Sequence, residues 1–177
     1  MKRTLLSGLA VLIVLASSLL ALRAQEEPCR LLDPESGRRF LPDRVPMEAE
    51  LIPVDGKNYS ALQFANKNRI AIAALVTAGY AKEIQQRYQY VLISETRIRL
   101  DRWSIPAGMV GLSMEPETQK DAPTRILIAR DFSGTEIDRI TLQLDPNASG
   151  SSVSFTPKGS REFELRIGRY LVQGSQR

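Results

Sequence analysis

Apolar residues occur in short runs separated by turn-forming residues over most of the chain beyond residue 47. Runs of this kind, repeated about every dozen residues and bounded by Gly, Pro, Asn or Asp, are typical of antiparallel β-sandwiches and barrels. The pattern predicts an all-β fold, a single antiparallel β-sandwich or partly closed barrel of about nine strands. The ten apolar runs from which these strands are expected cover residues 47–54, 59–64, 69–77, 88–93, 96–100, 109–114, 125–130, 137–144, 153–156 and 161–172.

Local signals add turns and one helix to this plan. Asp55-Gly56 predicts a tight turn, because Gly accepts positive φ. The loop at 131–135 is expected to join its two neighbouring strands as a hairpin. Ala81, Ile84 and Tyr88 fall at helical spacing, which predicts one short helix near 81–87.

The run at 69–77 differs from the other expected strands because apolar side chains fall on both of its faces. Its alanines leave a helix conceivable, but its Ile and Val content favours a buried central strand. One face carries Ile70, Ile72 and Val76, and the other carries Ala71, Ala73 and Leu75.

The N-terminus has the layout of a secretory signal peptide. Lys2 and Arg3 precede an apolar stretch at 5–22, and Ala24 lies just before a polar run. Residues 1–24 are expected to form a signal helix that is removed, which predicts a periplasmic or secreted protein. An apolar stretch of this length approaches the roughly 20 residues that cross a bilayer. An uncleaved anchor facing the periplasm is therefore the alternative.

The segment that follows the signal is rich in charge, proline and glycine. We expect residues 25–46 to form an irregular leader, followed by the β-sandwich domain at 47–174. The turn formers of this leader are Pro28, Pro34, Gly37, Pro42 and Pro46.

The basic excess of the chain is largely a targeting feature. The sequence has 24 Lys and Arg against 20 Asp and Glu. Lys2, Arg3 and Arg23 leave with the signal, so 21 basic residues remain against the 20 acids. A nearly neutral domain argues against nucleic acid as a partner. Membrane contact is expected only through the N-terminal segment, if it stays uncleaved.

The chain has no histidine and a single cysteine. The lack of histidine excludes Ser-His-Asp and Cys-His catalysis and removes the commonest ligand of zinc, copper and iron. The sequence also has no Gly-x-Ser-x-Gly, Ser-x-x-Lys or Gly-rich phosphate motif. We therefore expect no enzyme activity, no metal and no cofactor. Cys29 is expected to be a bystander in the leader, or to pair between molecules.

Paired carboxylates are the remaining acid–base option. Carboxylates two residues apart lie on one face of a strand, and a glycosidase needs two carboxyls roughly 5–9.5 Å apart. We expect these pairs to be solvated strand faces, with a glycan hydrolase as the alternative. The pairs are Glu48/Glu50, Glu115/Glu117, Glu136/Asp138 and Glu162/Glu164. A loop cluster of Asp121, Asp131, Glu136 and Asp138 lacks calcium-loop spacing.

Three aromatic residues are the candidates for ligand binding: Trp103, Tyr88 and Tyr90. An exposed Trp103 beside Asp101 and Arg102 would stack on a sugar ring, as aromatic side chains of binding sites do. Trp103 breaks the alternation of its strand, which places it at a strand end or bulge. A tryptophan there more often caps the core beside a Pro-Gly turn, and we favour that interpretation.

From about Tyr80 onward the chain resembles uncharacterised exported β-domain proteins of environmental bacteria. The resemblance rests on the segments 81–88, 105–111 with its Pro-Ala-Gly turn, and 163–170. Those relatives usually place an aromatic residue after the turn, whereas Met109-Val110 stands here. The resemblance covers about half the chain and implies an exported β-fold without a known activity.

The sequence thus predicts a non-catalytic exported protein, a binding or structural accessory domain of the cell envelope. Its expected partner is an envelope protein or a glycan. Two alternatives remain open. One is a carboxylate-dependent glycan hydrolase, and the other is a membrane-tethered assembly partner that uses residues 25–46 as a stalk.

Overall fold

The structure is a computed structural model and describes residues 27–116 and 124–177. Over these ranges the chain forms thirteen strands and two short helices. This confirms the all-β prediction, but the predicted numbers, about nine strands and one helix, are too low. The predicted signal peptide lies outside the described residues. The helices are α2 (Pro34–Phe40) and α3 (Lys82–Arg87). The strands are β1 (Arg30–Leu31), β2 (Arg44–Met47), β3 (Glu50–Gln63), β4 (Arg69–Leu75), β5 (Tyr90–Ser94), β6 (Ile98–Leu100), β7 (Trp103–Ile105), β8 (Gly108–Pro116), β9 (Arg125–Arg130), β10 (Glu136–Leu144), β11 (Val153–Pro157), β12 (Glu162–Ile167) and β13 (Tyr170–Gln176).

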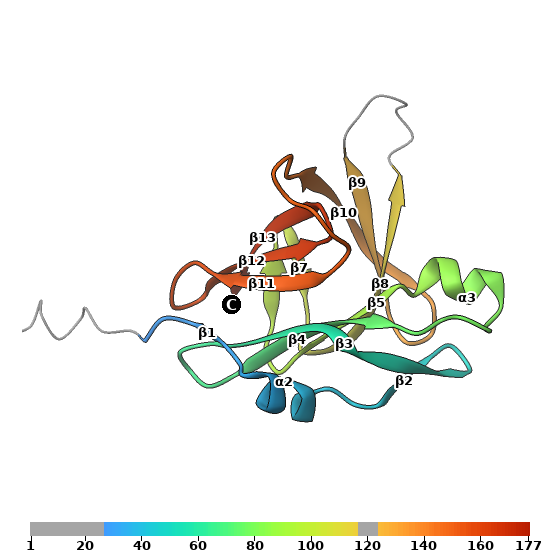
Figure 1. Ribbon diagram of the computed structural model, residues 1–177, viewed down its shortest axis with the longest axis horizontal. Coiled ribbons are helices and arrows are strands. Elements are labelled where there is room, and N and C mark those ends of the chain that lie inside the picture. Colours follow the sequence, from blue (N-terminus) through green and yellow to red (C-terminus); the bar gives the residue numbers. More distant parts are fainter. Residues whose placement is uncertain (1–26, 117–123) are drawn as a thin grey trace, which may run out of the picture.

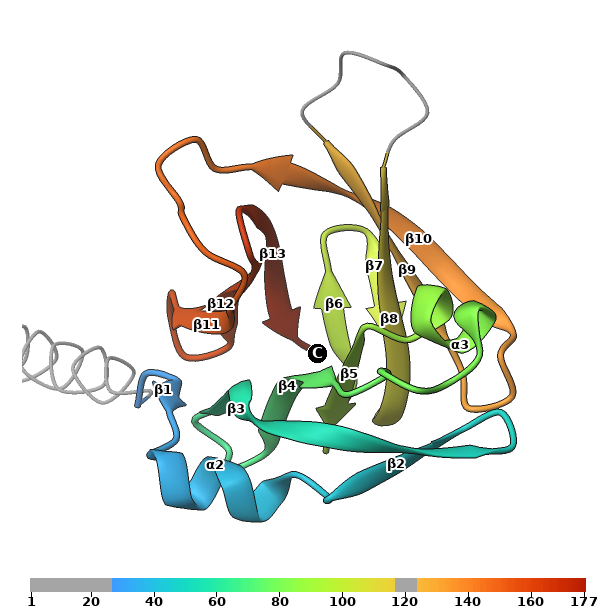
Figure 2. The same cartoon turned by 45° about the vertical axis from the view of Figure 1, so that its right-hand side comes forward.

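The strands form one antiparallel path that bends into a nearly closed barrel (Figure 1). Its order is β1-β3-β4-β5-β8-β9-β10-β13-β12-β11. Off this path, β2 pairs with β3, and the β6–β7 hairpin joins β13. Figure 2 shows β11, β12 and β13 on one side of the barrel, β8, β9 and β10 on the other, and the β6–β7 hairpin between them.

Side chains close the barrel where β11 lies beside β3, a junction that we call the seam. β11 takes its ladder hydrogen bonds from β12 alone. The Val153 backbone N–H donates to Asn58 Oδ1 at 3.0 Å, and the Phe155 N–H donates to Ser60 Oγ at 3.0 Å. These bonds satisfy amides that would otherwise form an open strand edge. The seam therefore depends on two polar side chains of β3.

Two apolar cores lie on opposite faces of the β3–β4–β5 sheet. One fills the barrel, and the other, the outer core, packs residues of β2 and α3 against the sheet. Figure 1 shows α2 and β2 below the sheet and α3 at its right-hand end. β4 is buried on both faces, with Ile70 and Ile72 in the barrel core and Ala71 and Ala73 in the outer core. This confirms the prediction of a buried central strand. Val76 lies beyond the strand end and is 45% exposed, so its predicted core position is wrong.

The prediction of an irregular leader at 25–46 is wrong for the part of it that the structure describes. β1, α2 and most of β2 lie there. Pro34 occupies the first turn of α2, where its missing N–H costs nothing. Asp33 caps the helix by accepting the Ser36 N–H at 2.9 Å. Pro34 and Gly37 thus belong to helix α2, and Pro46 belongs to edge strand β2. The described part of this segment covers the outer core.

Cys29 also differs from its predicted role as a bystander in an irregular leader. Only 3% of the residue is exposed, and it belongs to the barrel core. Its thiol donates to the Glu162 carbonyl oxygen at 3.2 Å. All thirteen strands pair within residues 30–176, and the described cores begin at Cys29. All the strands and both cores that the structure describes therefore lie within residues 29–176.

Two of the local predictions are confirmed and two are wrong. The short helix is confirmed by α3, and the hairpin across 131–135 is confirmed by β9 and β10. Asp55-Gly56 is not a tight turn, because β3 continues through it with a register shift between Val54 and Tyr59. The predicted single strand at 161–172 is two strands, since Gly168 turns with φ 60 between β12 and β13.

Candidate functional site

The three candidate aromatic residues do not meet. Trp103 and Tyr90 contribute to the barrel core, whereas Tyr88 belongs to the outer core. Trp103 is only 2% exposed, so the sugar-stacking interpretation is wrong and the core interpretation is confirmed. Its indole N–H is buried without a hydrogen-bond partner among the described residues. Burial also raises the pKa of Tyr90.

Tyr88 belongs to a polar cluster with Arg87 and Glu48. Its hydroxyl donates to Glu48 Oε1 at 3.0 Å, and the Arg87 guanidinium donates to the same oxygen at 3.0 Å. Burial, followed by the bond to Glu48, raises the pKa of Tyr88 to about 12. Glu48 has φ 52, and its backbone N–H donates to Phe132 O at 2.6 Å. The cluster thus holds the β2–β3 turn against the β9–β10 turn, which is a structural role.

A hollow forms along the outer face of β13 because its neighbouring strands do not cover one edge completely. β10 pairs with β13 only as far as Leu171, and β6 pairs with it only from Gly174 onward. Two adjoining hollows of about 350 and 120 Å³ lie here and share Asp101 and Gln173. We call them together the β13 groove. Its polar side chains are Arg99, Asp101, Thr141, Gln143, Glu162 and Gln173.

Most of these groove side chains have no intramolecular partner. Five are exposed and form no hydrogen bond or ion pair with any other residue that the structure describes. They supply a guanidinium, two carboxylates, a hydroxyl and an amide, so the groove can both donate and accept hydrogen bonds. The five are Arg99, Asp101, Thr141, Gln143 and Glu162.

Gln173 is held in place at the centre of the groove. Its Nε2 donates to Glu164 Oε2 at 3.1 Å, which leaves the amide oxygen as a free acceptor. Glu164 is only 9% exposed and also receives Arg166 Nη2 at 3.2 Å. Asp101 is fixed by its backbone N–H, which donates to the Gln173 carbonyl at 2.8 Å. The centre of the groove is thus fixed by hydrogen bonds of Gln173, whereas the exposed side chains around it form no such bonds with described residues.

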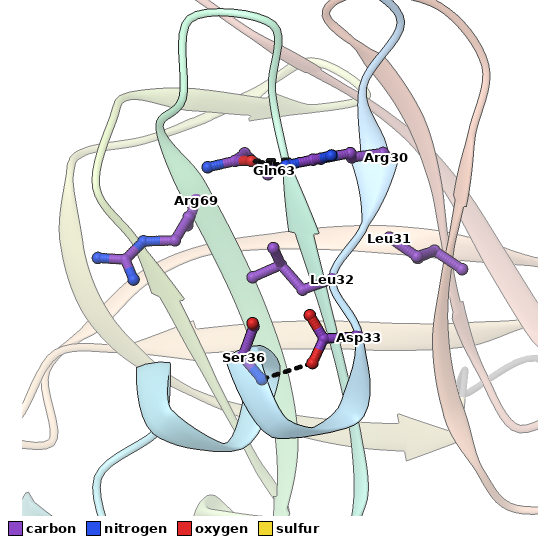
Figure 3. Close-up of a pocket in the computed structure, with 7 residues that line it drawn as sticks. All are labelled: Arg30, Leu31, Leu32, Asp33, Ser36, Gln63 and Arg69. Atoms are coloured by element: carbon purple, nitrogen blue, oxygen red, sulfur yellow. Dashed lines mark hydrogen bonds between the residues drawn. The ribbon is translucent and has the colours of Figure 1, made fainter.

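A second hollow, of about 450 Å³, lies between β1, α2 and β3 (Figure 3). Its polar groups are already used within the fold. Arg30 donates twice to Gln63 Oε1, at 3.0 and 3.3 Å, and Asp33 caps α2. Arg69 is bound to both oxygens of Glu95, which lowers the pKa of that carboxyl. This hollow therefore offers fewer free groups than the β13 groove.

Three of the seven described carboxylates in the predicted pairs form ion pairs, namely Glu48, Glu136 and Glu164. Glu136 binds Arg139, with 2.6 Å between Oε1 and Nη2, and Glu164 binds Arg166. Glu162 faces the groove, whereas its predicted partner Glu164 lies in the network beneath it. Glu117 lies outside the described residues. The solvated-face interpretation is confirmed for the exposed carboxylates Glu50, Glu115, Asp138 and Glu162, and it is wrong for Glu164, which is buried.

The loop acids do not form a calcium site in the described part of the chain. There, no three His, Cys, Asp or Glu residues group in a way that could hold a metal ion. Asp131 organises the β9–β10 turn by accepting from the backbone N–H groups of Ser133 and Thr135 at 2.9 and 3.0 Å. A further hydrogen bond from the Ser133 side chain leads the causes that lower the pKa of Asp131. Asp121 is among the residues that are not described.

Sequence reasoning missed the groove because its residues are ordinary polar positions of separate strands. Thr141 and Gln143 are the outward members of an alternating strand, and Gln173 follows a turn that the pattern did not reveal. Their neighbourhood depends on the order β6–β13–β10, which no local signal encodes. Asp101 was noticed only as a neighbour of Trp103.

Comparison with protein-family models, with curated proteins and with solved structures finds no match to this chain. Among the described residues, no helix is long and apolar enough to cross a membrane.

Proposed function

We propose that the chain is a non-catalytic, exported domain of the bacterial cell envelope that binds a hydroxyl-rich glycan in the β13 groove. The observation that carries this proposal is the set of five exposed polar side chains around Gln173, which have no partner among the described residues. Each sugar hydroxyl can both donate and accept a hydrogen bond. The donors and acceptors of the groove side chains are therefore suited to bind sugar hydroxyls. Because the groove lacks an aromatic platform, binding is expected to depend on hydrogen bonds alone.

The same groove bears on the glycan hydrolase alternative, because Asp101 and Glu162 both line it. Both side chains are exposed, and a carboxylic acid that serves as general acid usually lies in a dry apolar setting. Outside the groove, the described carboxyls whose pKa departs from its ordinary value have a lowered pKa, as for Glu95 and Asp145. A general acid needs a raised pKa instead. These features favour binding without turnover.

The stalk form of the tethered alternative loses its support. Residues 30–47 pack on the barrel and cannot extend away from it without uncovering the outer core. A membrane-bound form would have to hold the domain close to the bilayer. Export itself remains a proposal that rests on the N-terminal pattern of the sequence.

Binding to a panel of immobilised glycans tests the proposal. We expect at least one glycan class to bind residues 25–177, and affinity to fall at least tenfold in Thr141→Val and Gln173→Ala, since each loses hydrogen-bonding groups at the ligand. The matched controls are Thr156→Val on β11 and Gln86→Ala on α3, both exposed and away from the groove. Absence of binding to every glycan would refute the glycan proposal.

The same panel separates binding from hydrolysis. Products released from any bound glycan are analysed for the wild type, Asp101→Asn and Glu162→Gln. We expect no product from any of the three. Turnover by the wild type that disappears in either variant would overturn the non-catalytic assignment in favour of the hydrolase.

A further inference from the structure

Four segments of the barrel meet at the end from which the described chain begins. Backbone hydrogen bonds join Cys29 to Gly159 at 2.8 Å and Ala65 to Ser160 at 3.5 Å. The C-terminal residues join two further segments to this end. The Gln176 N–H donates to the Arg161 carbonyl, and the Arg177 N–H donates to the Arg97 carbonyl. Figure 1 shows β1 beside the loop between β11 and β12 at this end. We define the basic end as residues 27–30, 65–69, 95–97 and 158–162.

This end carries the whole charge excess of the described residues. It has six Lys and Arg against three Glu, while all described residues together have 20 basic and 17 acidic side chains. The rest of the barrel is therefore balanced. The basic side chains are Arg30, Lys67, Arg69, Arg97, Lys158 and Arg161, and the acidic ones are Glu27, Glu95 and Glu162.

Half of these cations form no ion pair with a described residue, although the charge of Arg30 is among the causes that lower the pKa of Glu27. Arg97 and Arg161 are exposed and form no ion pair with another described residue, and the Arg30 guanidinium binds only the neutral Gln63 amide. Beside Arg30, Leu31 is 51% exposed (Figure 3). Unpaired arginines beside an exposed leucine are the combination that binds the headgroups and the upper acyl region of an anionic bilayer.

The length of the chain before this end fixes which face can approach a membrane. Six residues, 23–28, separate the apolar stretch at 5–22 from Cys29. Even fully extended they reach only about 20 Å. If the stretch enters a bilayer, during export or as a lasting anchor, the basic end is the part of the barrel held against the lipid surface.

We infer that the basic end docks on an anionic phospholipid surface, through Arg30, Arg97 and Arg161 with Leu31 at the rim. The docking is electrostatic and reversible when the apolar stretch has been removed. It does not require a glycan in the β13 groove, although the two surfaces share Glu162. Each cation within a Debye length of an anionic surface strengthens binding about fivefold at moderate salt.

Cosedimentation of residues 25–177 with lipid vesicles tests this inference. Vesicles of phosphatidylcholine alone are compared with vesicles that also contain phosphatidylglycerol, at low and high salt. We expect binding only to the anionic vesicles, and loss of that binding at high salt. The double reversal Arg97→Glu/Arg161→Glu is expected to weaken binding by roughly twentyfold or more.

The matched control is Arg44→Glu/Arg169→Glu. Both of its arginines are exposed, lack an ion-pair partner in the described chain and lie outside the basic end. It changes the net charge equally, so equal weakening by the two pairs would mean that net charge alone acts. That result, the absence of binding to anionic vesicles, or tighter binding to a soluble polyanion such as DNA would each overturn the inference. A thermal melt of each variant shows whether it is folded.

Discussion

Removing the two side chains that close the seam is expected to open the barrel along β11. In Asn58→Ala/Ser60→Ala, the Val153 and Phe155 backbone N–H groups lose acceptors that now lie at 3.0 Å. Both bonds are partly buried, and a buried donor left without a partner costs about 1–3 kcal/mol. Because water can reach a partly buried seam, we take about 1–2 kcal/mol for each site.

The double variant should therefore lose about 2–4 kcal/mol of unfolding free energy. For a domain of this size, that loss lowers Tm by roughly 6–15 °C. Calorimetry measures this change in Tm. The control is Thr156→Ala, because Thr156 is an exposed residue of β11, the strand that the seam holds. Hydrogen exchange locates the change: the amides of Val153 and Phe155 should exchange faster, while those of β9 and β10 should not. Unchanged protection at both amides would show that β11 is held by its packing alone.

Three further variants test other parts of the fold. The phenol of Tyr88 is expected to ionise near pH 12 in the folded protein and near pH 10 in the unfolded chain. Its contribution to stability is therefore complete below pH 10 and is lost as the pH rises toward 12. Ultraviolet titration and unfolding measured at each pH check this, and Tyr88→Phe should remove the pH dependence. Gly174→Ala should lose about 1–3 kcal/mol in chemical denaturation, because its Cβ would lie 2.5 Å from Phe163 Cε2 and 2.9 Å from Leu100 Cδ2. Full stability would mean that the Phe163 ring moves at little cost. Cys29 should react with a thiol reagent only after unfolding, because 3% of the residue is exposed; rapid labelling of the native protein, or a disulfide-linked dimer, would contradict its core position.

The parts of the fold that the sequence predicted are those that local patterns determine. Helix α3, the β9–β10 hairpin and the buried strand β4 each follow from the spacing of apolar residues within one segment. Turn signals were less reliable, because tertiary contacts decide whether a Gly makes a turn. Gly56 lies within β3 beside the Arg38 side chain, whereas Gly168 turns the chain between two strands.

Features that depend on the order of strands could not be predicted. The seam joins residues 95 positions apart, and the β13 groove joins β6, β10, β12 and β13. The N-terminal segment was misjudged for a related reason. Its prolines and charges are typical of a linker, but Asp33 and Pro34 begin a helix whose apolar residues complete a core on the far side of the sheet.

The two proposed surfaces meet at Glu162, which lies in the β13 groove and within the basic end. Along β13, the groove begins at Leu171, and at the end of the strand the Gln176 N–H donates to the Arg161 carbonyl. A domain docked by its basic end would therefore present a groove that rises from the lipid surface along the side of the barrel. Thr141 and Gln143 line the part of the groove that is farther along β13 from that surface, so docking should leave them accessible. We expect vesicle-bound protein to bind its glycan with unchanged affinity, measured by adding labelled glycan to washed vesicles. Competition between vesicle and glycan would mean instead that the groove mouth at Glu162 is covered by the membrane, and that the two surfaces act as alternatives.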